Sequence, residues 1–311
     1  MITARETRLV RAADPAAFRR AIGDLVLPLS PFEATATFVL TPTRAAAEQL
    51  RRTLEARHLA SAPALVLPAL GARADLYDAL HLRLAEPARR LTAFEREVMI
   101  AASARESSSA GAPAPFTLRP GLIAEILNLY DALRRQLRTV ARFEEYLADE
   151  LERDLESDRG AVRMLQQTRF LAATFRGYEA RVSASGALDE HALRERLLAE
   201  PSARPLTRLI VTMVDRAADP HGLWLSDFDL MARLPGLTHL DIVATEAMLA
   251  AGFLERLHGH LPGLEEDRVV DPAWGRPLLE VPSAGEWVFP SRDREEELAA
   301  VARRLKADRR A

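Results

Sequence analysis

The sequence predicts an α/β protein in which a large all-helical insertion interrupts a parallel sheet. Residues 35–40 are apolar and rich in β-formers, as in a buried strand, and an amphipathic helix follows directly from Arg44. A strand that leads straight into a helix is half of a parallel β–α unit. Helical patterns then dominate until an apolar run at 208–214 restores the alternation. We therefore expect residues 1–85 and 201–311 to form two parts of one α/β domain, with the insertion at 86–200.

The first part of the α/β domain holds three expected strands, each followed by helical spacing. A short first strand is expected at residues 8–10, apolar runs lie at 35–40 and 64–67, and the helices are expected at 15–25, from 44 onward and at 72–85. Either Thr41 or Thr43 can cap the second helix, and Pro42 suits its first position if Thr41 is the cap. The apolar face of that helix is expected to comprise Ala46, Ala47, Leu50 and Leu54.

The insertion reads as a set of helices joined by polar segments. Helices are expected at 92–104, 120–137, 143–155 and 162–182, with a short one after Asp189. Thr92 suits a helix cap, because Glu95 stands three residues further on. Residues 106–115 are rich in serine, alanine and proline, which predicts an exposed linker.

The second part of the α/β domain resumes the strand–helix pattern. Strands are expected at 208–214, 239–243, 278–281 and 287–289, and helices at 224–231, 246–258 and 293–306. The last helix carries a clean apolar face made of Leu298, Val301, Ala302 and Leu305. Such a face is explained by a helix that closes the fold or contacts a partner.

Composition excludes several classes of site. The 311 residues contain no cysteine, which rules out disulfides, thiolate metal sites and cysteine nucleophiles. Lys306 is the only lysine and lies far from any strand–helix junction, so no phosphate-binding P-loop is expected. The net charge of −3 means that any site for a polyanion must be a local patch. Because no signal peptide or membrane-length apolar stretch is evident, we expect a cytoplasmic protein without membrane contact or cofactor.

The junction at Thr43 and Arg44 is the first candidate binding site. Both residues lie where a buried strand leads into a helix N-terminus, and the N–H groups and dipole there favour an anion. A phosphate of a nucleic acid is one natural anion for this position. The alternative is an ordinary β–α turn that binds nothing.

Other polar groups favour structural roles. Asp215 and Asp219 follow a buried strand, where nucleotide-hydrolysing folds hold magnesium, but the alternative is a turn in which Asp219 caps the next helix. His258 and His260 have no further ligand at suitable spacing, so no metal site is expected. The arginines at 134, 135 and 138 predict a solvated charged face.

Several of these segments, in order, resemble UvrD-like helicases. They are closer still to the inactivated helicase region of AddB/RexB-type subunits of bacterial helicase–nucleases, which belong to the PD-(D/E)XK nuclease family proteins. The resemblance is carried by residues 39–50 (VLTPTRAAAEQL), 65–68 (LVLP), 178–181 (YEAR), 186–189 (GALD), 209–215 (LIVTMVD) and 289–297 (FPSRDREEE). It implies a P-loop-NTPase-like core of the UvrD/RecB domain 1 type, with Asp215 in the Walker B position and Glu297 in a late helicase motif.

The departures from the family matter as much as the matches. Active members carry a glutamate after the Walker B aspartate, where this chain has Arg216, and the Walker A lysine is absent. The resemblance thus implies a scaffold that does not hydrolyse nucleotide, within a helicase–nuclease that repairs DNA double-strand breaks by recombination; the exonuclease domain of that enzyme is not expected among these residues. Such a scaffold would contact single-stranded DNA through Thr43 and Arg44. It would also pack against a motor or nuclease partner subunit. Alternatives are a protein-interaction module without DNA binding and an active ATP-dependent helicase. Because AddB-type chains continue into further domains, the chain resembles their N-terminal portion.

Overall fold

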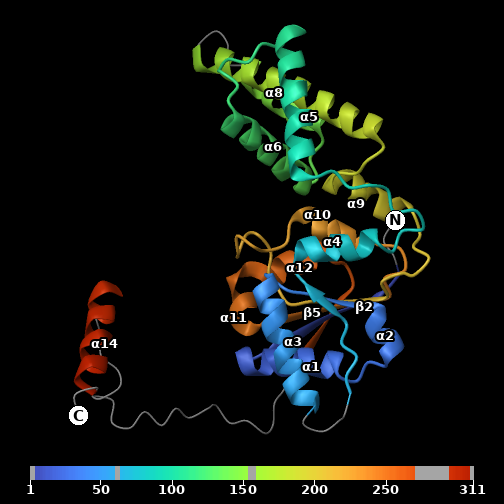
Figure 1. Cartoon of the computed structure of the whole chain (residues 1–311), viewed down its shortest axis with the longest axis vertical. Helices are drawn as coiled ribbons and strands as arrows, with labels where there is room; N and C mark the ends of the chain where they lie inside the picture. The colour runs from blue at the N-terminus through green and yellow to red at the C-terminus, as the bar shows by residue number, and fades with distance from the viewer. Residues whose placement is uncertain (1–3, 60–63, 153–158, 270–293, 309–311) are drawn as a thin grey trace. The chain divides into compact units, whose positions relative to one another are not determined.

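The computed structural model describes residues 4–59, 64–152, 159–269 and 294–308 (Figure 1). It divides into two compact units, Met1–Val270 and Asp271–Ala311. The expected strands at 278–281 and 287–289 lie outside the described residues. In the parts of the chain that are described, no helix combines the length and apolarity needed to cross a membrane.

The first unit is built on a six-stranded sheet in which every neighbouring pair is parallel. The strand order is β3-β2-β4-β5-β1-β6. The strands are β1 (Glu6–Ala12), β2 (Thr37–Leu40), β3 (Ala69–Gly71), β4 (Arg208–Val211), β5 (His239–Thr245) and β6 (Leu264–Val269). Because β4 joins β2 across a long helical segment, the predicted α/β class with a helical insertion is confirmed at this level.

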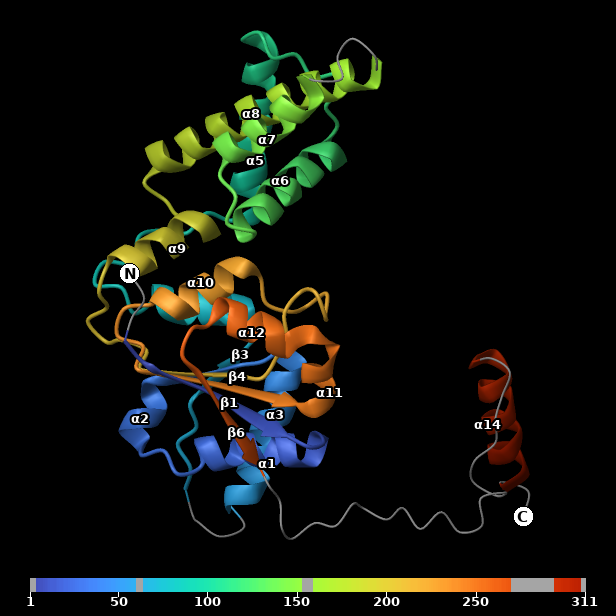
Figure 2. The same ribbon diagram turned by 180° about the vertical axis from the view of Figure 1, so that it is seen from behind.

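Helices cover both faces of the sheet, which explains why β2, β4 and β5 read as nearly continuous apolar runs. On one face lie α1 (Pro15–Val26) and α3 (Arg44–Leu59). On the other lie α4 (Arg73–His81), α10 (Leu225–Arg233) and α12 (Leu254–His260), as Figure 2 shows. Side chains alternate accordingly: Val39 and Ile210 pack toward α1 and α3, whereas Leu40 and Leu209 pack toward α4 and α10.

The structure corrects the boundaries around β2 and β3. Residues 31–35 form a short helix, α2 (Pro31–Thr35), whose cap Ser30 forms a capping box with Glu33, so the strand begins at Thr37 rather than at residue 35. Thr43 caps α3, and Pro42 therefore precedes the helix. The apolar run at 64–67 is not a strand. The third strand, β3, begins only after Pro68.

The insertion consists of α5 (Ala93–Ser109), α6 (Pro120–Arg135), α7 (Val140–Glu152), α8 (Arg159–Ser185) and α9 (Glu190–Ala199). Its separate core is rich in aromatic side chains, including Phe170, Phe175 and Tyr178. The expected cap at Thr92 is confirmed, with Glu95 completing the capping box. The linker predicted at 106–115 is wrong in its first part, because α5 continues to Ser109 and buries Ser107.

The helix predicted at 246–258 is broken into three pieces. They are α11 (Glu246–Met248), the π-helical turn η1 (Leu249–Phe253) and α12, and Gly252 at the break has a φ of 81°. A positive φ of this size favours glycine. The second unit contains α14 (Arg294–Asp308), on which Leu298 and Leu305 are exposed.

Candidate functional site

The carboxyl edge of the sheet is the natural place for a ligand in a parallel α/β fold. The chain leaves β2 there through Thr41 and Thr43, and leaves β4 through Thr212 and Asp215. The two strands are neighbours, and Thr212 ties them together because its hydroxyl donates to the Leu40 carbonyl at 2.9 Å. The structure therefore brings both candidate sites predicted from the sequence to the same edge.

The N-terminus of α1 is occupied by the protein's own carboxylate. Only two residues separate β1 from α1, and the second of them, Asp14, is the helix cap. One of its oxygens accepts hydrogen bonds from the backbone N–H groups of Ala16 and Ala17, each at 2.8 Å. These donors would otherwise be available to an anion. Asp14 thus fills the position that a phosphate would take after the first strand.

Asp215 is buried and held by an arginine from α12. Its two carboxylate oxygens accept from Nη2 of Arg256 at 2.9 Å and from Nε of the same guanidinium. The hydrogen bonds to Asp215 raise the pKa of Arg256 above its ordinary value. Gly222 passes so close that a Cβ there would lie 2.3 Å from the Asp215 carbonyl, so this crossing requires glycine.

Asp219 shapes the loop after Asp215 and does not cap a helix. Its side chain accepts from the backbone N–H of His221 at 2.7 Å. The next helix, α10, starts only at Leu225, and Asp227 accepts from the N–H of its cap residue, Trp224, at 2.8 Å. The expected turn is therefore correct, but the expected helix cap at Asp219 is wrong.

A third carboxylate at this edge, that of Glu246, is also bound by a group of the chain itself. Glu246 follows β5 and accepts from Nε and Nη2 of Arg11 at 2.9 and 2.6 Å. Arg11 also donates to Glu266 on β6 at 2.5 Å. These bonds raise the pKa of Arg11 and lower the pKa of Glu246. Asp14, Asp215 and Glu246 are thus each bound by groups of the chain itself.

Thr43 and Arg44 form the start of α3. The Thr43 hydroxyl accepts from the backbone N–H of Ala46 at 3.1 Å, which makes it the helix cap. The Arg44 side chain is 75% exposed but already paired, with Nη2 donating to Asp75 at 2.7 Å. This bond lowers the pKa of Asp75.

A groove of about 430 Å³ runs between α1 and α3 beside this helix start. Phe18, Pro42 and Leu50 give it apolar walls, and Arg19 and Gln49 supply polar groups. Arg19 is exposed and forms no ion pair with any residue that the structure describes. Sequence reasoning missed Arg19, because its place in a groove beside α3 depends on how α1 packs against α3.

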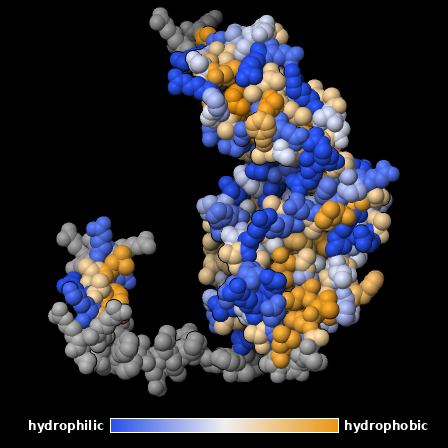
Figure 3. Space-filling view, in the orientation of Figure 1, coloured by the Kyte–Doolittle hydropathy of each residue, from blue (hydrophilic) through white to orange (hydrophobic). Residues whose placement is uncertain are grey.

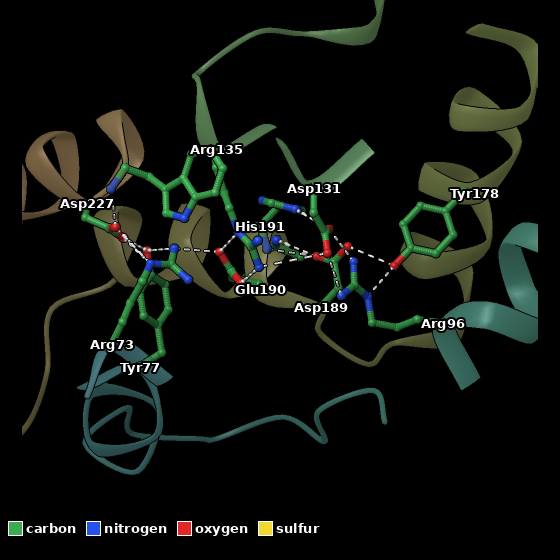
Figure 4. Close-up of polar contacts among 12 residues, drawn as sticks. Arg73, Tyr77, Arg96, Asp131, Arg135, Tyr178, Asp189, Glu190, His191 and Asp227 are labelled. Carbon is green, nitrogen blue, oxygen red and sulfur yellow. Dashed lines mark hydrogen bonds and ion pairs between the residues drawn. The ribbon is translucent and has the colours of Figure 1, made fainter. Parts of the chain in front are cut away.

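A partly buried ionic network connects the helical insertion to the α/β core (Figure 4). Arg73 on α4 donates to both oxygens of Asp227 at 2.9 and 2.8 Å and to Glu190 on α9 at 2.6 Å. Glu190 also accepts from Arg135 on α6 at 3.0 and 2.7 Å. The solvated face predicted for Arg135 is therefore wrong. Its side chain is only 25% exposed and stabilises the contact between helices.

The network continues inside the insertion around Asp131. This carboxylate accepts from Arg96 on α5 at 2.5 Å and lies 2.9 Å from Nε2 of His191. Burial alone would raise its pKa, but the bonds with His191 and Arg96 lower the pKa of Asp131 overall. Arg96 also donates to the Tyr178 hydroxyl at 2.8 Å. These contacts are structural, because each charged group has an internal partner.

The remaining predicted positions form no site within the described residues. His258 contacts Glu266 at 2.9 Å, and the ring of His260 lies 5.0 Å from that of Phe228. No group of three potential metal ligands occurs among the residues whose placement is described. Glu297 is exposed on α14 in the second unit. No family model matches this chain, and no curated protein matches it either.

Proposed function

We propose that this chain is a helicase-like scaffold that does not hydrolyse nucleotide and that binds single-stranded DNA within a helicase–nuclease for double-strand-break repair. The observation that carries the proposal is that the groups which could bind a nucleotide at the carboxyl edge of the sheet are already bound by other groups of the chain. Nucleotide hydrolysis needs a phosphate cradle and a carboxylate free to hold magnesium. Here Asp14 occupies the first helix N-terminus, and Asp215 is held by Arg256.

The fold supports the P-loop-NTPase-like part of the proposal. A six-stranded parallel sheet with helices on both faces is compatible with such a core. Two of the segments that carry the helicase resemblance fall at element boundaries: residues 39–50 span the β2–α3 junction, and residues 186–189 lead into α9, with Asp189 as its cap. Residues 178–181 lie inside α8. Asp215 follows β4, as the Walker B comparison requires.

The groove between α1 and α3 is the best supported place for DNA. Phe18 and Pro42 offer an apolar surface for a base or sugar, and Arg19 can reach a phosphate without giving up an ion pair with a described residue. The start of α3 adds the N–H groups and dipole that favour an anion. Arg19 is therefore the proposed phosphate contact, with Thr43 next to the groove residue Pro42. Arg44, which the sequence also suggested, lines the groove on the other side of α3 and is paired with Asp75, so it falls outside this site.

The test is fluorescence-anisotropy binding of a labelled oligothymidylate at two salt concentrations. We expect Arg19→Ala to weaken binding and to lower the salt slope by about 0.7, the value for one single-strand phosphate contact. Arg105→Ala is the matched control, because Arg105 is exposed on α5, away from this groove. Equal effects of the two substitutions would rule out the groove. ATP hydrolysis above background that Asp215→Ala abolishes would overturn the scaffold and favour an active helicase.

A protein-interaction module without DNA binding is the second candidate. It is favoured by one observation: Arg44, the arginine at the helix start, is already paired with Asp75. An arginine that must first break an ion pair gains less from a phosphate. Absence of oligothymidylate binding by the wild-type chain even at low salt would support this module.

A further inference from the structure

Strand β3 forms an open edge of the sheet. It pairs with β2 on one side, and no described strand lies on its other side. The Gly71 carbonyl accepts from the backbone N–H of Thr41 at 2.9 Å, so Gly71 faces β2. Because successive residues of a strand in a parallel sheet face opposite neighbours, the N–H and C=O of Leu70 point to the open edge. Such an edge is a template for another strand.

A groove of about 870 Å³ follows this open edge between α3 and α4. Its walls include the apolar side chains of Leu59, Leu65, Leu67, Leu70 and Leu82. Leu59 and Leu82 are 53% and 68% exposed, so the groove presents apolar surface at its mouth. Figure 3 shows an apolar area beside the hydrophilic outer face of α3. The groove therefore offers both backbone hydrogen-bonding groups and an apolar contact surface.

Charged side chains lie along the rim of the groove. Four carboxylates line it, from Glu48, Glu55, Asp75 and Asp78, against two guanidiniums, from Arg44 and Arg51. Three of the carboxylates are paired: Asp75 with Arg44, Glu48 with Arg51 and Arg52, and Asp78 with Arg90. Glu55 forms no ion pair with any residue in the described ranges. The carboxylate of Glu55 therefore favours a basic side chain in an occupant of the groove.

We propose that this groove binds an extended basic segment of a partner protein, which adds to β3 as a further strand. Main-chain bonds to Leu70 supply part of the affinity, and alternate apolar side chains of the segment enter the groove. Its lysines or arginines, on the face toward α3, approach Glu55 at the rim. This surface lies on the side of α3 opposite the groove that contains Arg19. The proposal therefore stands independently of DNA binding.

The experiment uses the full chain and a fluorescein-labelled hexapeptide of alternating lysine and valine. A hexapeptide of alternating glutamate and valine is the charge control. We expect the basic peptide to bind and the acidic one not to bind. Leu70→Pro removes the outward N–H, a change that edge strands tolerate, and should weaken binding about tenfold. Glu55→Arg should weaken it about threefold, as expected for one exposed ion pair.

Two controls keep the test decisive. Glu125→Arg makes the same charge change on the exposed surface of α6 and should leave binding unchanged. Circular dichroism reports whether Leu70→Pro folds, and if it does not, Glu55→Arg alone decides. Failure of the basic peptide to bind overturns the proposal, as does equal binding of the acidic peptide. Equal effects of Glu55→Arg and Glu125→Arg overturn it too.

Discussion

Arg73→Met tests whether the ionic network holds the helical insertion to the α/β core. Arg73 is 18% exposed and makes charged contacts with Asp227 and Glu190, whose side chains are 5% and 16% exposed. Removing one partner of a buried ion pair costs about 3–5 kcal/mol, because it leaves a buried charge uncompensated. Glu190 keeps its bonds from Arg135, and Asp227 keeps the Tyr77 hydroxyl at 3.1 Å. We therefore expect the lower end, about 3 kcal/mol.

The assay is urea unfolding at pH 7, followed by circular dichroism. Arg105→Met is the control: this exposed substitution should change the free energy of unfolding by less than about 0.5 kcal/mol. The double variant Arg73→Met/Asp227→Asn removes both charges but keeps an acceptor for the Trp224 N–H. It should lose less stability than the two single variants together, with a coupling of about 0.5–3 kcal/mol. An Arg73→Met protein within about 1 kcal/mol of wild type would refute the reasoning.

Two further predictions concern pH and backbone packing. Burial opposes ionisation of Glu190, but bonds from Arg135 and Arg73 lower its pKa below the ordinary 4.5. A lowered pKa contributes stability above the unfolded value, and this stability is lost as the pH falls through the folded pKa. Wild type should therefore lose more stability below about pH 4.5 than Glu190→Gln does, as measured by urea unfolding across pH. Gly222→Ala should destabilise by about 1–3 kcal/mol, because its Cβ would overlap the Asp215 backbone. Unchanged thermal unfolding of Gly222→Ala would contradict that geometry.

The central strands could be predicted from sequence because both of their faces are buried. β2, β4 and β5 are nearly continuous apolar runs, and each was expected within a few residues of its place. The edge strands carry no such signal. β6 reads Leu-Glu-Glu-Asp-Arg-Val, and its register is set by pairing with β1 and by the bond of Glu266 to Arg11. β3 is only three residues long. Its identity as a strand depends on pairing with β2, which no local pattern reveals.

The candidate site, like the sheet, contains residues that the sequence could place and residues that it could not. Thr43 and Asp215 could be placed at one edge from sequence, because parallel strands align their carboxyl ends. The residues that pair with the carboxylates of this region could not be identified from the sequence. Arg256 follows Asp215 by 41 residues, and Arg73 precedes Asp227 by 154. Such pairs depend on which helices pack together, so a composition rich in arginine predicts ion pairs without identifying their members.

The internal pairs at the carboxyl edge direct where a ligand can bind. Magnesium at Asp215 would have to displace the two hydrogen bonds from Arg256, and a phosphate at α1 would have to displace Asp14 from two N–H groups. Arg256 and Asp14 belong to the same chain as the groups they bind and are already held next to them. They therefore act at a high effective concentration, which a free ion must overcome. The two sides of α3 carry no such internal competitor at Arg19 or Glu55 among the described residues. Since Arg19 lies on one side of α3 and Glu55 on the other, the proposed DNA site and the proposed peptide site lie on opposite sides of this helix.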